Sequence, residues 1–353
     1  MRIPAPIVHQ SCRRTRYGWP PTPCGFTFAD CAQAVPLEKE SRVAHSRHDS
    51  SACLLREPLM PTIDDYLHVC EQAARTGGQV VQHWLGRTDV REKGPADLVT
   101  QADFASQEAV RQTVLTAFPT HCLLGEENPA ASADPQTQGQ TAQPLAFGED
   151  VKTGAACPGR DTNQTSKSAE YRWIVDPLDG TTNFVHGIPH YCVSLALERR
   201  GELLVGAVFD PTRNECFTAA AGQGSRLNGQ PIRVSNISDL SEAVAAVGFP
   251  PNVQRDAPDL RLFLRILDRC QAIRRTGSSA LNLCYLAAGR FDLFWSYSTK
   301  VWDVAAGVLI VREAGGIVTS PTGGAFVLDE AHFLAAANPQ LHTQLRETAD
   351  SLG

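Results

Sequence analysis

Two aspartates lie three residues apart in the segment WIVDPLDGTTNFVHGIP, residues 173–189. Asp176 follows an apolar Trp-Ile-Val run that is typical of a buried strand, so we expect the strand to end there and the next residue, a proline, to begin a turn. Asp179 precedes Gly180, which permits unusual backbone angles, and Thr181, which can cap a short helix. Carboxylates attract cations, whereas the free N–H groups of a helix start attract anions, so a divalent metal ion that carries a phosphate would satisfy both. The motif alone is also typical of an Asx turn with a capping threonine.

Further carboxylates lie at the boundaries of predicted elements. Glu126 follows a short strand predicted over residues 122–125, and Asp303 begins a helix predicted over residues 303–314. Asp103 belongs to a capping box that opens a helix running to about residue 118. Each acid also has a purely structural explanation. Glu126 could be a solvated loop residue, Asp303 could be favoured by the helix dipole, and Asp103 could serve only as a cap. Only their combination with the two aspartates points to a site.

The pattern of the remaining elements predicts an α+β fold. An amphipathic helix begins near Met60, and the last predicted helix ends at Gly315 as a C-cap should. Between them we expect strands over residues 190–198, 203–210 and 215–219, a tight turn at Asn228-Gly229, helices over 260–271 and 279–288, and a strand over 291–297. Helices, then a run of strands, then alternation indicate layered α+β rather than a simple doubly wound sheet.

Composition describes an ordinary globular protein. The chain has 353 residues, a formal net charge of −6, 42% hydrophobic and 20% charged residues. No apolar run is long enough to span a bilayer, so we expect no membrane association, and the acidic balance argues against nucleic acid as the main partner. The 11 cysteines lack C-x-x-C spacing, which favours reduced thiols over disulfides or zinc and predicts a cytoplasmic location.

Two segments differ in composition from the rest of the chain. Residues 1–59 are rich in Arg and Pro and have no sustained apolar period, so we expect a disordered N-terminal extension. Residues 129–168 contain almost no large apolar residue and are expected to form a flexible insertion. The prediction is therefore one catalytic domain over residues 60–353 with an internal insertion.

Three blocks in fixed order resemble the inositol monophosphatase family: DLVTQADFASQEAV with LLGEEN, then WIVDPLDGTTNFVHGIP, then WDVAAGVLIVREAGG. Long patterned blocks are far more specific than one short motif. The resemblance implies a five-layer α-β-α-β-α sandwich of the fructose-1,6-bisphosphatase and inositol monophosphatase type. It also implies Mg²⁺-dependent, lithium-sensitive hydrolysis of small phosphate monoesters, and a homodimer.

Site residues follow from the same resemblance. It implies that the metal ligands are Glu126, Asp176, the Leu178 carbonyl, Asp179 and Asp303. It implies that Thr181 and Asp103, together with Glu126, act in catalysis, and that the substrate contacts are Gly180, Thr181, Gly277, Ser278 and Ser279. A ligand set made only of oxygen atoms favours Mg²⁺ or Mn²⁺ over zinc. Lys93 stands where the family has a mobile basic residue.

The sequence departs from the family at Ser296, where family members commonly have a glutamate that binds a substrate hydroxyl. Inositol 1-phosphate is the expected substrate, and 3′-phosphoadenosine 5′-phosphate or a sugar (bis)phosphate remains an alternative. An inactive phosphatase-like binding protein is the alternative from another class. Retention of every metal carboxylate argues against inactivity, because clustered acids without a metal would destabilise the fold.

Overall fold

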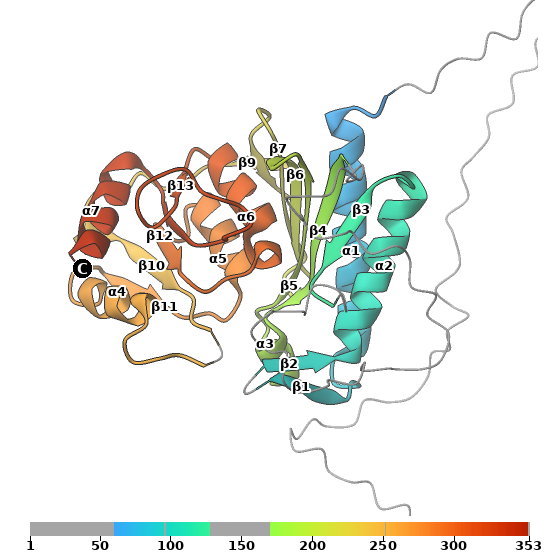
Figure 1. The fold of residues 1–353 in the computed structure, drawn as a ribbon, viewed down its shortest axis with the longest axis horizontal. Coiled ribbons are helices and arrows are strands. Elements are labelled where there is room, and N and C mark those ends of the chain that lie inside the picture. The colour runs from blue at the N-terminus through green and yellow to red at the C-terminus, as the bar shows by residue number, and fades with distance from the viewer. Residues whose placement is uncertain (1–59, 95–96, 128–169, 251, 352–353) are drawn as a thin grey trace, which may run out of the picture. The chain divides into compact units, whose positions relative to one another are not determined.

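The computed structural model of the protein describes residues 60–94, 97–127, 170–250 and 252–351. Every described helix and strand lies within one compact unit, Pro61–Gly353 (Figure 1). The predicted N-terminal extension and the predicted insertion lie outside the described residues.

A seven-stranded sheet forms the larger of the two main sheets. Its strands follow chain order, with β3 parallel to β4 and each later neighbour antiparallel. The strands are β3 (Cys122–Gly125), β4 (Tyr171–Asp179), β5 (Cys192–Arg199), β6 (Glu202–Asp210), β7 (Glu215–Ala220), β8 (Ser225–Leu227) and β9 (Gln230–Ile232). Asn228 and Gly229 have φ angles of 48° and 79° between β8 and β9, so the predicted tight turn is confirmed.

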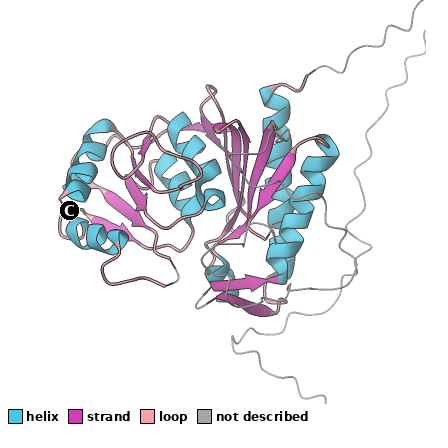
Figure 2. Cartoon of the chain, viewed as in Figure 1, coloured by secondary structure: helices cyan, strands magenta, loops and turns pink. Residues whose placement is uncertain are grey.

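Helices cover both faces of this sheet because side chains alternate along its strands. On β5, Val193 and Leu195 pack toward α1 (Ile63–Trp84) and α2 (Gln101–Ala117). Ala196 faces the opposite way, toward α5 (Ser279–Ala287) and α6 (Val301–Glu313). Figure 2 shows these helix pairs on the two sides of the sheet. The predicted capping box at the start of α2 is confirmed, since Thr100 caps the helix and Asp103 bonds back to it.

A smaller mixed sheet of five strands completes the arrangement. Its order is β11 (Ala272–Arg274), β10 (Val244–Val247), β12 (Leu293–Ser296), β14 (Phe333–Ala336) and β13 (Ile317–Thr319). Its inner face packs on α5 and α6, and its outer face packs on α4 (Pro258–Ile266) and α7 (Pro339–Asp350). The predicted order of five layers, α-β-α-β-α, is therefore confirmed.

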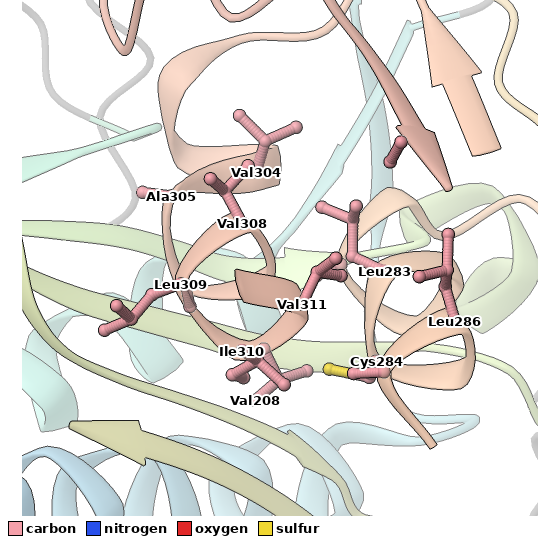
Figure 3. Packing of buried hydrophobic residues seen from close by; sticks show 14 of the residues in the cluster. Val208, Leu283, Cys284, Leu286, Val304, Ala305, Val308, Leu309, Ile310 and Val311 are labelled. Carbon is pink, nitrogen blue, oxygen red and sulfur yellow. The ribbon is translucent and has the colours of Figure 1, made fainter. Parts of the chain in front are cut away.

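The central helix layer forms the core between the two sheets (Figure 3). Every α6 residue from Val304 to Val311 is buried, as a helix that is apolar on all sides requires. Close approach is made possible by small residues: a Cβ atom added at Gly307 would lie 2.6 Å from the Cβ atom of Leu283 on α5. This core fixes the start of α6, and therefore Asp303, relative to the large sheet.

Some elements differ from their predicted bounds. Strand β4 continues through Pro177 to Asp179 instead of ending at Asp176, and its register with β5 shifts between the two aspartates. The shift explains how a proline fits there, since an irregular position needs no ladder N–H. The hairpin of β1 (Val90–Gly94) and β2 (Asp97–Thr100), four short strands of the small sheet and α7 were not predicted.

The membrane and cysteine predictions have different outcomes. In the described parts of the chain, no helix combines the length and apolar character needed to cross a bilayer. Four described cysteines are buried free thiols, and a fifth is half-buried: Cys70, Cys192, Cys216, Cys284 and Cys270. These five bear out the expectation of reduced thiols, whereas Cys122 is disulfide-bonded and corrects it, because sequence spacing does not show which cysteines meet in space.

Candidate active site

A cavity of about 440 Å³ lies where the ends of β3 and β4 meet the loops that follow β10 and β11. This volume suits a small organic ligand. All predicted site residues except Asp103 line it: Glu126, Asp176, Leu178, Asp179, Gly180, Thr181, Gly277, Ser278, Ser279 and Asp303. The structure thus brings together residues that are up to 177 positions apart in the sequence, from Glu126 to Asp303.

The end of β4 presents Asp176 and Asp179 to the cavity. The Asp176 carboxylate accepts a hydrogen bond from the Leu178 backbone N–H at 3.0 Å, which stabilises the irregular part of β4 between the two aspartates. Gly180 follows in the left-handed region at φ 94°, and a Cβ atom there would lie 3.0 Å from the His190 carbonyl oxygen. Only glycine fits both requirements, so this residue sets the direction of the chain as it enters α3 (Thr181–Val185).

Asp179 is held by the first turn of α5. Its Oδ2 atom accepts hydrogen bonds from the Ser278 hydroxyl at 2.6 Å and from the Ala280 N–H at 2.7 Å. Ser278 was predicted as a substrate contact, but it is buried and its hydroxyl is committed to Asp179. These contacts fix the orientation of the Asp179 carboxylate, which lines the cavity.

Thr181 and Asp103 form the predicted pair, with Asp103 behind the cavity wall. The Thr181 hydroxyl donates to the Leu178 carbonyl at 3.0 Å and lies 3.4 Å from Oδ1 of Asp103. It does not cap α3, because Gly180 is the N-cap residue and no side chain caps that helix. Burial, followed by the charge of Glu127, raises the pKa of Asp103 to about 7. The pair therefore holds a hydroxyl at the cavity and an acid that can exchange a proton near neutral pH.

Glu126 meets Lys93 from the β1–β2 hairpin. The Lys93 ammonium lies 2.9 Å from Glu126 and also contacts Glu127. Burial opposes the charge of Lys93, yet the two carboxylates hold the pKa of its ammonium above its usual range. Burial raises the pKa of Glu127 to about 7. Lys93, which the resemblance noted but which was not among the predicted site residues, therefore contacts Glu126 without lining the cavity.

The carboxylates that line the cavity repel one another. Burial and the charges of Glu126, Asp179 and Asp303 raise the pKa of Asp176 well above its usual range. The pKa values of Asp179 and Asp303 are also raised, first by burial. The two side chains are only half-buried because they face the cavity. Such a cluster is stabilised when a cation binds to it.

The donor chemistry of this cluster fits Mg²⁺. As the side chains stand, no three His, Cys, Asp or Glu groups among the described residues converge closely enough to hold a metal ion. The donors are nevertheless all oxygen atoms that line one cavity. Carboxylates gathered in this way are suitable ligands for a hard divalent cation.

Three residues do not lie where the sequence indicated: Ser296 is absent from the cavity wall, whereas Phe249 and Arg275 are part of it. Ser296 is fully buried, bonds to Ser298, and is not among the residues that line the cavity, so it is not placed to reach a substrate through water. Phe249 and Arg275 line the cavity and were not predicted. Arg275 precedes the predicted Gly277-Ser278-Ser279 segment by two residues, which was the one available signal.

Comparison with known proteins gives concordant matches. A family model described as the inositol monophosphatase family matches residues 63–353. The inositol-1-monophosphatase of Rhizobium meliloti is 39% identical over 285 residues, which cover 80% of this chain and 94% of that protein. The Nus factor SuhB of Pseudomonas aeruginosa is 37% identical over 275 residues, or 76% of this chain and 90% of that protein.

Solved structures match over a similar length. The extragenic suppressor protein SuhB of Bartonella henselae has a TM-score of 0.67 and 33% identity, and the match covers 80% of this chain and 98% of that structure. The inositol monophosphatase of Anabaena has a TM-score of 0.65 and 31% identity, with 82% and 97% covered.

Proposed function

Because the chain belongs to the inositol monophosphatase family, we propose that it is a Mg²⁺-dependent phosphatase that hydrolyses small phosphate monoesters at this cavity. Phosphatase chemistry is the common property of the family, whereas the metal, the substrate and the role of each residue are proposed here. One observation carries the proposal: Glu126, Asp176, Asp179 and Asp303, from three different elements, line one cavity beside the Thr181–Asp103 pair.

The proposed division of labour follows from the contacts. Asp176, whose pKa is raised by burial and by the charges of Glu126, Asp179 and Asp303, would hold Mg²⁺ together with these three carboxylates. Ser278 fixes the orientation of Asp179 through its hydroxyl. The proposed phosphate contacts are Gly180, Thr181, Gly277 and Ser279.

A phosphate monoester is a dianion that repels an attacking oxygen. Mg²⁺, when bound, supplies charge neutralisation at the phosphate and a more acidic water. The Thr181 hydroxyl can accept a hydrogen bond from the attacking water and orient it. Asp103, with a pKa near 7, can accept the proton that this hydroxyl relays.

Inositol 1-phosphate is the first substrate to test, and a sugar bisphosphate or 3′-phosphoadenosine 5′-phosphate is the alternative. We also propose that the active form is a homodimer, as the resemblance to the inositol monophosphatase family implies. Light scattering of the purified protein would test this. Several relatives carry the name Nus factor SuhB, but no described feature of this chain favours such a role over phosphatase chemistry.

Asp176→Asn tests the proposal. We expect phosphate release to fall by at least about 100-fold, because a proposed metal-binding carboxylate loses its charge. The same change removes a buried carboxyl group whose ionisation is opposed by burial and by its acidic neighbours, so the melting temperature of the metal-free protein should rise. Phosphate release with Mg²⁺ and with EDTA, together with thermal unfolding in EDTA, measures both effects.

Asp268→Asn is the matched control, because Asp268 is exposed near the end of α4 and does not line the cavity. It should change neither quantity. Undiminished turnover in Asp176→Asn, or full activity in EDTA, would reject the proposed site. A folded wild-type protein without activity on any phosphate monoester would favour the inactive binding protein.

A further inference from the structure

The wall of the cavity that lies toward the small sheet has a different character from the acidic wall. Strand β10 ends at Val247, and Gly248 and Phe249 continue along the cavity. Strand β11 ends at Arg274, and the next residue, Arg275, also lines the cavity. Arg275 is the only cationic side chain among the described residues that line it.

Arg275 is held in place by an aromatic ring and not by an acid. Its guanidinium carbon lies 5.6 Å from the centre of the Phe249 ring, a cation–π contact. Phe249 in turn packs edge to face on Phe263 of α4, with ring centres 5.8 Å apart. No carboxylate in the described part of the chain pairs with Arg275. The donors of its guanidinium fork therefore remain available to a ligand.

We propose that Arg275, seated on Phe249, selects substrates whose alcohol part carries a second anionic group. This inference rests on the proposed function, because it assumes that the scissile phosphate binds at the acidic wall with its metal ions. The alcohol then extends toward the wall that carries Arg275. A guanidinium binds a phosphate or carboxylate with two parallel hydrogen bonds, whereas a neutral hydroxyl uses only one donor and no charge.

The charge distribution supports a second anion over a neutral polyol. Five acidic residues line the cavity, namely Asp97, Glu126, Asp176, Asp179 and Asp303, and bound metal ions would neutralise those nearest the scissile phosphate. The Phe249 ring contacts the Arg275 guanidinium and packs against the Phe263 ring. We therefore assign to Phe249 the role of positioning the guanidinium. Ser296 is buried and does not line the cavity, so its side chain does not offer a hydrogen-bond acceptor to a hydroxyl group of the substrate.

A matched pair of substrates tests this inference. Inositol 1-phosphate and inositol 1,4-bisphosphate differ by one phosphate, and kcat and KM for phosphate release are measured with Mg²⁺ for wild type, Arg275→Gln and Arg274→Gln. We expect the wild type to prefer the bisphosphate. Arg275→Gln should lower kcat/KM for the bisphosphate by about 10- to 100-fold, mainly through KM, because a charged hydrogen bond is lost. It should leave the monophosphate unchanged.

Arg274→Gln is the matched control. Arg274 is an exposed neighbour whose guanidinium bonds to the Ile273 carbonyl and which does not line the cavity. Its removal should alter neither substrate. Equal losses on both substrates in Arg275→Gln, or no loss on either, would overturn the inference while leaving the phosphatase assignment intact. Absence of phosphate release from both substrates in the wild type would overturn the proposed function and the inference together.

Discussion

At the scale of single residues, His121 shows how burial fixes a protonation state far from the cavity. Its ring is stacked between Phe118 and Tyr171, with ring centres 4.9 and 4.6 Å away. The indole N–H of Trp173 donates to its Nδ1 atom at 3.0 Å, so that nitrogen carries no proton. Burial lowers the pKa of His121 below its ordinary value. A proton therefore binds more readily to the unfolded chain than to the folded protein.

The sign of the pH effect follows from this pKa. A histidine whose folded pKa is depressed contributes stability above its unfolded pKa of about 6.5, and that stability is lost as the pH falls below this value. As the pH falls from 7.5 to 5, the free energy of unfolding should decrease less steeply in His121→Gln than in the wild type. The difference between the two slopes should be at most about 1.4 kcal/mol per pH unit. Urea unfolding at several pH values measures the slope.

His68→Gln is the control, because His68 is exposed on α1. It should retain the slope of the wild type. An unchanged slope in His121→Gln would show that protonation of His121 does not oppose folding.

Residues whose role depends on sequence neighbours could be predicted, and those whose role depends on a distant partner could not. Asp176 and Asp179 could be selected as candidates because a strand end and a helix start lie within one short segment, and both line the cavity, while their roles as ligands stay a prediction. The hydrogen bond of Ser278 to Asp179 forms only where the end of β4 in the large sheet meets the start of α5. The contact of Arg275 with Phe249 forms only because β10 and β11, which are distant in sequence, pair in the small sheet. No local pattern in the sequence contains that information.

At the scale of elements, the crossing of α5 and α6 controls where Asp303 stands. Gly307→Ala has two opposing effects on stability. The first is favourable, because alanine stabilises a helix by about 1 kcal/mol relative to glycine. However, the added methyl would lie 2.6 Å from the Leu283 Cβ atom, which is fixed to the helix backbone and cannot rotate away. Overpacking of this kind costs about 1 to 3 kcal/mol, so the clash should win.

We therefore expect Gly307→Ala to lower the free energy of unfolding, measured by urea denaturation. The double variant Gly307→Ala, Leu283→Ala relieves the contact with the Leu283 Cδ1 atom, which is also 2.6 Å away, but not the contact with its Cβ atom, which remains. Leu283→Gly in the Gly307→Ala background removes that atom and should be less destabilising than the sum of the two single changes. A stabilised Gly307→Ala protein would show that the helices cross less closely than described.

The sequence predicted helices and strands correctly where the spacing of apolar residues repeats several times. The helices α1 and α2 and strands β5 and β6 are long enough to show it, and their caps and turns agree with their patterns. The strands β10, β11, β13 and β14 have three or four residues each, too few for an alternation to be recognised. Their pairing comes from the helices that cover them, which a local pattern cannot show.

At the scale of the whole molecule, the five layers explain why the site lies where it does. The large sheet supplies Asp176 and Asp179, the central helices supply Asp303 and the start of α5, and the small sheet supplies the wall with Arg275. Composition and element order predicted a layered α+β fold, but only the resemblance predicted five layers. The reason is that strand order and sheet number depend on contacts between distant segments.

The last prediction concerns the part of the chain that is sufficient for folding. All three hydrophobic clusters of the described residues lie within Pro61–Gly353, and α1 supplies buried side chains to one of them: Tyr66, Cys70, Ala73, Ala74 and Val81. We expect a protein of residues 60–353 to retain the melting temperature and the kcat of the full chain. A protein of residues 85–353, which lacks α1, should fail to fold, because one face of the large sheet would lose its cover. Thermal unfolding and phosphate release compare the three proteins. If residues 60–353 unfolded at a clearly lower temperature than the full chain, the first 59 residues would have to contribute to the fold.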